Sequence, residues 1–138
     1  MKVEPLSERM LNNKQHWKKV GCKILHHYGC EETYAGIGRC IDLWKNTDST
    51  ESQKYPETEI LDGLGFLLGE LCVTEFGGGW VWITDEYGSI PAICHPGAET
   101  VSYIMDSVSR RLRDKGCAED EIPTIAAMYE RAQHDQIN

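Results

Sequence analysis

The sequence has no long apolar run, so we expect neither a membrane-spanning protein nor a secreted one. No stretch approaches the roughly 18 consecutive apolar residues that a membrane span needs. The most apolar segment, residues 64–73, is interrupted by Gly65, Gly69 and Glu70. Residues 1–5 have no apolar stretch behind their single lysine, so they do not resemble a secretory signal. We therefore expect a cytoplasmic protein with no membrane partner.

Basic side chains are also scarce. The 14 Lys and Arg residues are outnumbered by 22 Asp and Glu residues, and the formal net charge is −8. Such a chain has no electrostatic attraction to nucleic acid. The charge instead favours a basic protein partner. The six cysteines are expected to be reduced, because disulfides are rare in the cytosol.

The first half of the chain has helical periodicity. Ser7 is a good N-cap for a first helix, and Gly29 fits a stop at its end. A second helix from about Glu31 carries an apolar stripe with steps of three and four residues. After a polar loop at residues 46–58, a third helix is expected to about Glu75. Its interior contains three glycines, which indicates that another element packs closely against it: Gly63, Gly65 and Gly69.

The pattern then changes to that of strands. Residues 80–84 and 89–94 form a predicted hairpin, and a third strand is expected within residues 99–103. Pro91 places the second strand at an edge or a bulge. Two helices follow at about 105–115 and 120–133, with Pro123 in the first turn of the last one. The prediction is one α+β domain over residues 1–138: a helical N-terminal half, a short antiparallel sheet around a Trp-rich hairpin, and C-terminal helices.

Two groups of residues are candidates for chemistry. Cys22, His26 and Cys30 are four residues apart and would share one face of a helix, but this is not the spacing of a structural zinc site. Cys94 and His95 are adjacent, so on a strand their side chains point to opposite faces. We therefore expect no metal, no cofactor and no catalytic residue. A metal- or thiol-dependent hydrolase that uses these residues is the enzyme alternative.

The favoured site is a protein-binding surface. Trp80 and Trp82 share one face of their strand, and the turn beside them presents a tyrosine and two carboxylates. Glu70 lies at the apolar boundary of its helix, where we expect it to reach solvent or to pair with Arg110 or Arg111. The predicted partner-binding residues are Asp85, Glu86, Tyr87, Trp82 and Glu70.

The central block also resembles a family of small bacterial proteins described as a domain of unknown function. The matching motifs are Leu64-Gly65-x-x-x-Gly69-Glu70, Gly79-Trp80-Val81-Trp82, Asp85-Glu86-Tyr87-Gly88, Pro91-Ala92 and the helix at residues 107–112. Members of this kind occur among the immunity proteins of polymorphic-toxin and contact-dependent competition systems. The resemblance covers about half of the chain and carries no catalytic residues with it.

The expected function is that of an immunity protein. It would bind a cognate bacterial toxin and cover the toxin's active or substrate-binding surface. The acidic charge suits a basic, nuclease-like toxin, because carboxylates can occupy sites meant for phosphate. The alternatives are the hydrolase and a secretion-system adaptor or chaperone.

Overall fold

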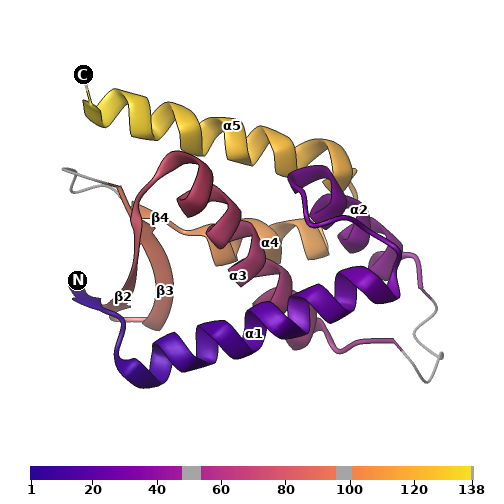
Figure 1. Ribbon diagram of the computed structural model, residues 1–138, viewed down its shortest axis with the longest axis horizontal. Coiled ribbons are helices and arrows are strands. Elements are labelled where there is room, and N and C mark those ends of the chain that lie inside the picture. Colours follow the sequence, from indigo (N-terminus) through magenta and orange to yellow (C-terminus); the bar gives the residue numbers. More distant parts are fainter. Residues whose placement is uncertain (48–53, 96–100, 138) are drawn as a thin grey trace.

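The computed structural model describes residues 1–47, 54–95 and 101–137 (Figure 1). The fold is α+β, as predicted, with five helices and a four-stranded sheet in the described residues. The elements follow the order β1 (Lys2–Pro5), α1 (Glu8–His27), α2 (Tyr34–Lys45), α3 (Glu57–Phe76), β2 (Gly79–Asp85), β3 (Gly88–Cys94), β4 (Val101–Ser102), α4 (Ile104–Arg113) and α5 (Ala118–Ile137).

The sheet lies at one end of the helical layer. In Figure 1, α1 runs along the lower side of the molecule and α5 along the upper side, with α3 and α4 between them and the sheet at the left. The strand order is β1-β2-β3-β4, with every pair antiparallel. The first strand was not predicted, because Lys2–Pro5 has no alternating pattern of its own. It forms because it pairs with β2, with Val3 opposite Ile83.

Most helix boundaries follow the sequence signals. The Ser7 hydroxyl accepts the Met10 N–H at 3.2 Å, and Gly29 has a φ of +68° at the end of α1. The second helix begins later than expected, at Tyr34. The reason is that Thr33 supplies its N-cap, with the Gly36 N–H donating to Thr33 Oγ1 at 2.9 Å.

Two prolines lie at positions that differ from the predicted ones. β3 is an inner strand of the sheet rather than an edge strand, but β4 pairs only with Ile93 and Cys94. Among the described residues, Pro91 therefore has no strand partner on the β4 side, and a missing N–H is harmless there. Pro123 lies inside α5 rather than in its first turn, because the helix already begins at Ala118. The expected third strand is confirmed only as Val101–Ser102, since residues 96–100 lie outside the described residues, as do residues 48–53 of the expected loop.

α3 is the central helix, and its glycines are contact points for three different elements. A Cβ atom added to Gly21 of α1 would overlap the carbonyl oxygen of Gly63. A Cβ on Gly65 would overlap the Met105 side chain of α4, and one on Gly69 would overlap the Trp80 ring of β2. The predicted close approach to α3 is confirmed at all three positions. Most of the middle of this helix is buried, which is the pattern of a helix packed on all sides.

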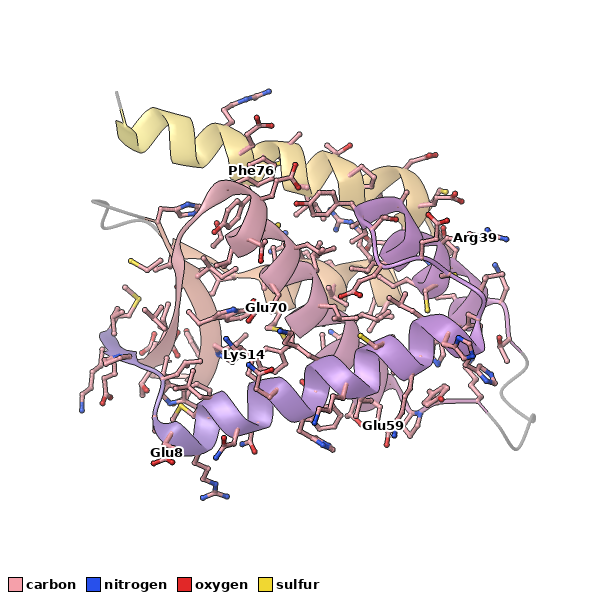
Figure 2. All side chains as sticks on the ribbon, viewed as in Figure 1. Glu8, Lys14, Arg39, Glu59, Glu70 and Phe76 are labelled. Carbon is pink, nitrogen blue, oxygen red and sulfur yellow. The ribbon has the colours of Figure 1, made fainter. Side chains whose placement is uncertain are left out.

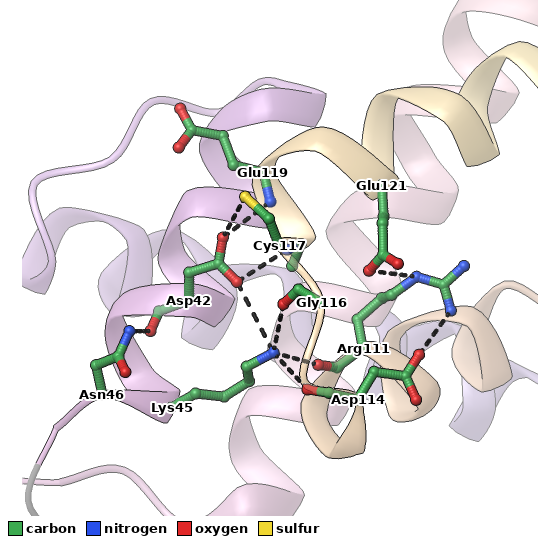
Figure 3. Close-up of polar contacts among 10 residues, drawn as sticks. Asp42, Lys45, Asn46, Arg111, Asp114, Gly116, Cys117, Glu119 and Glu121 are labelled. Atoms are coloured by element: carbon green, nitrogen blue, oxygen red, sulfur yellow. Dashed lines mark hydrogen bonds and ion pairs between the residues drawn. The ribbon is translucent and has the colours of Figure 1, made fainter.

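The junction between α4 and α5 is held by two side chains of α2 (Figure 3). The Asp42 carboxylate accepts the backbone N–H groups of Ala118 at 2.9 Å and Glu119 at 3.0 Å. The Lys45 ammonium donates to three backbone carbonyls at the end of α4 and beyond, those of Arg111, Asp114 and Gly116 at 2.8 to 3.2 Å. We call this pair the Asp42–Lys45 clamp. A negative charge at a helix N-terminus and a positive charge at a C-terminus are both stabilising, so the clamp explains why α5 starts at Ala118.

We expect Gly21→Ala to destabilise the fold by about 1–3 kcal/mol, the usual range for overpacking. The added methyl group meets backbone atoms of Gly63, so α1 and α3 must separate. Gly79→Ala is the matched control, because a Cβ at Gly79 meets no atom within 4 Å. Urea unfolding measures both free energies. Equal stability of the two variants would show that the α1–α3 contact tolerates a side chain.

We expect Asp42→Ala to destabilise the fold by about 1–2 kcal/mol, as for loss of a helix N-cap. The substitution leaves the Ala118 and Glu119 N–H groups without their carboxylate acceptor. Glu32→Ala is the control, because it removes the same charge from an exposed loop position. Chemical denaturation of both variants gives the comparison, and a loss no larger than that of Glu32→Ala would contradict the role assigned to the clamp.

Candidate partner-binding surface

The tip of the β2–β3 hairpin is a tight turn stabilised by its own side chains. The Asp85 carboxylate accepts the Tyr87 N–H at 2.8 Å, and the hydroxyls of Thr84 and Ser89 are 2.8 Å apart across the strands. Gly88 has a φ of +133°, a conformation that glycine adopts without strain. Asp85, Glu86 and Tyr87 are therefore held together at the tip, as the sequence predicted. Tyr87 is 90% exposed.

The two tryptophans of the hairpin have different surroundings. Trp80 packs against Phe66, with ring centroids 5.2 Å apart, and its ring covers Gly69. It is therefore part of the interface between the sheet and α3. Trp82 is half-buried and lines a groove at the surface. Both rings are partly buried, and of the two Trp82 is the one that lines this groove.

This hollow, which we call the Trp82 groove, has a volume of about 180 Å³. Three structural elements and one connecting residue converge on it. Helix α1 contributes residues spaced along one face, α3 contributes two residues four apart, and the hairpin contributes an opposed cross-strand pair. The lining residues are Leu6, Met10, Asn13, Trp17, Asp62, Phe66, Trp82 and Pro91.

Asp62 is the one carboxylate in this apolar lining. Burial raises the pKa of its carboxyl group above the ordinary value of 3.8, because a charged form loses hydration there. Within the described chain, no cation lies at ion-pair distance from it. Asp62, Trp17 and Phe66 line the groove but were not among the predicted site residues. The sequence does contain a signal for Asp62, because it is the only charged residue in the apolar stretch between Ile60 and Gly69.

Glu70 does not belong to this surface. Its carboxylate pairs with the Lys14 ammonium of α1 at 2.7 Å, and both side chains are largely buried between α1 and α3 (Figure 2). The prediction that Glu70 pairs with Arg110 or Arg111 is therefore wrong. Arg110 pairs with Asp106 at 3.0 Å, and Arg111 pairs with Asp114 and Glu121 at 3.6 and 3.3 Å. The Lys14 ammonium group also lies 6.0 Å from the Trp80 ring centroid. The Glu70–Lys14 pair therefore stabilises the packing of α1 on α3 and the sheet.

A larger hollow of about 380 Å³ lies between α4 and α5, and Arg110, Arg111, Met128 and Tyr129 are among its lining residues. Both arginines in it already have carboxylate partners on the protein. Its charges are therefore compensated within the chain. The carboxylate of the Trp82 groove differs in this respect.

None of the residues of the hydrolase alternative is among the lining residues of these two hollows, although His95 contacts Ser102 and Tyr129, which line the larger one. Cys22 and His26 are exposed on α1, and Cys30 lies beyond the helix end. No cluster of three His, Cys, Asp or Glu residues suited to a metal ion occurs within residues 1–47, 54–95 and 101–137. The Cys94 thiol lies 3.8 Å from the His95 carbonyl oxygen. The buried His95 ring instead has Nε2 2.6 Å from the Ser102 hydroxyl, and its centroid lies 4.7 Å from that of the tilted Tyr129 ring.

Comparison with known proteins defines the family. Residues 41–129, more than half of the chain, match the family DUF3806, which is described as a domain of unknown function. The chain belongs to this family. No curated protein and no solved structure matches the chain. The match includes the hairpin, Asp62 and the Asp42–Lys45 clamp, while β1 and α1 precede it. In the part of the chain that the structure describes, no helix has the length and apolarity needed to cross a membrane.

We expect Asp62→Asn to raise the free energy of unfolding at pH 7, because the amide has no charge to desolvate. The carboxyl pKa is higher in the folded protein than in the unfolded chain. The folded state therefore binds more protons in the window between those two values, and stability falls as the pH rises through it. Unfolding of the wild type and of Asp62→Asn from pH 3 to pH 8 tests this. A variant less stable than the wild type at pH 7 would show that Asp62 has a stabilising partner.

Proposed function

We propose that the chain is a cytoplasmic immunity-type protein that binds a cognate bacterial toxin and covers its active or substrate-binding surface. The observation that carries the proposal is the hairpin tip, where Tyr87 is 90% exposed on a turn fixed by Asp85. A large aromatic side chain exposed to water on a preorganised turn contributes little to the stability of the fold. In protein interfaces, however, tyrosine is a frequent source of binding energy.

The charge of this surface supports a basic partner. Asp85 and Glu86 directly precede Tyr87 at the tip, and the whole chain has a formal net charge of −8. Carboxylates at such a position form charge-assisted hydrogen bonds with Lys or Arg and speed association with a basic surface. In a nuclease-like toxin these basic residues would be the ones that hold phosphate. The family match is compatible with this function but does not supply it, because function depends on the site rather than on the fold.

The test takes the protein encoded by the neighbouring gene as the candidate toxin, and measures its affinity for the chain and the protection of cells that express both. We expect Tyr87→Ala to weaken binding by about 2 kcal/mol or more, the effect of removing an interface hot spot. We expect Asp85→Asn/Glu86→Gln to slow association and reduce its salt dependence. These replacements remove charge, while the amide introduced by Asp85→Asn retains an oxygen that can accept the Tyr87 N–H.

Glu31→Gln/Glu32→Gln is the matched control, because it removes two charges from exposed positions on the α1–α2 connection. It should leave both protection and affinity close to the wild type. Full protection and unchanged affinity in the folded tip variants would remove the hairpin tip from the binding surface.

A further inference from the structure

The Trp82 groove contains an acid, Asp62, whose charge no described residue of the chain compensates. Two other acids with largely buried side chains illustrate the usual arrangement, since Glu70 is paired with Lys14 and Asp42 accepts two backbone N–H groups. Asp62 has neither kind of contact among the described residues. Burying part of a carboxylate without a partner is unfavourable, and a cation supplied by a ligand would offset that cost.

The walls around Asp62 are suited to the rest of such a cation. Trp17, Phe66 and Trp82 offer aromatic surface, and Met10 and Pro91 add aliphatic surface. Cations are attracted to the faces of aromatic rings, and tryptophan is the most favourable of them. The groove therefore combines a carboxylate, aromatic faces and an apolar channel in one small volume.

Its size decides what class of ligand it accepts. Small-molecule sites usually enclose about 300–1,000 Å³, whereas the Trp82 groove has about 180 Å³. That volume suits one long side chain rather than a free metabolite. The groove lies on the same hairpin as the tip, with the Trp82–Pro91 pair three residue pairs from Asp85–Gly88, or about 10 Å along the strands. A partner that contacts Tyr87 can thus reach the groove as well.

We propose that the Trp82 groove receives an arginine side chain of the protein partner, with Asp62 binding the guanidinium group and the tryptophans covering its plane and stem. This rests on the proposed binding function and specifies the partner's chemistry. Arginine fits better than lysine because its planar guanidinium group stacks on aromatic rings and binds a carboxylate through two parallel hydrogen bonds.

The groove can be tested without the partner, by titrating the full chain with N-acetyl-arginine amide and following the indole N–H signals by NMR. We expect the Trp17 and Trp82 signals to move. The Trp44 signal should stay, because its Nε1 donates to the Tyr55 carbonyl outside the groove. N-acetyl-lysine amide should bind more weakly, and N-acetyl-norleucine amide, which has an uncharged stem, should bind weakest.

Asp62→Asn keeps the shape of the side chain and removes its charge, so the variant should fold, which circular dichroism verifies. We expect it to lower the affinity for the arginine amide at least about tenfold, as for loss of a charge-assisted hydrogen bond. Glu57→Gln, an exposed acid at the start of the same helix, is the control and should bind like the wild type. Equal affinity of Asp62→Asn and wild type, or equal binding of the norleucine amide, would overturn the proposal.

The toxin experiment separates the two proposals. If the candidate toxin binds the wild type and Asp62→Asn equally well, the proposed arginine contact is wrong and the proposed immunity function stands. If that toxin does not bind the wild type, the immunity function is wrong, and the amide titration alone decides whether the groove accepts arginine.

Discussion

The close packing of three elements against α3 is the constraint on which the rest of the structure depends. Gly63 admits the backbone of α1, Gly65 admits Met105 of α4, and Gly69 admits the Trp80 ring. Each glycine lowers the intrinsic helix propensity by about 1 kcal/mol relative to alanine. The burial of α3 among these neighbours offsets that cost, because contacts on every side of one helix remove a large apolar surface from water.

This packing also creates the Trp82 groove. The contact between Gly21 and Gly63 brings the N-terminal part of α1, with Met10 and Trp17, alongside Asp62 and Phe66. Trp80 fixes β2 against Gly69, and the next residue on the same face of that strand is Trp82. The α1 wall precedes the part of the chain that matches the family, while the Asp62 and Trp82 walls lie inside it. The groove is therefore a joint product of the family core and the N-terminal segment of this chain.

The acids of the protein fall into distinct roles according to their partners. Asp42 supports the start of α5, and Glu70 joins α1 to α3 through Lys14. Asp85 organises its own turn through the Tyr87 N–H. In the described structure Asp62 has no such contact, so of these four acids it is the one without an intramolecular interaction that stabilises the fold.

The sequence by itself determined the local features: the Ser7 and Gly29 ends of α1, the hairpin with its tip, and the need for close contacts at the α3 glycines. These depend on the residues' own backbone preferences and on periodicity, which short stretches of sequence contain. Only the tertiary structure decided that β1 joins the sheet, that Glu70 pairs with Lys14 rather than an arginine, and that Trp17, Asp62 and Trp82 line one groove. Those contacts join segments far apart in the chain, and their partners are selected by how the helices pack around α3, which no local pattern specifies.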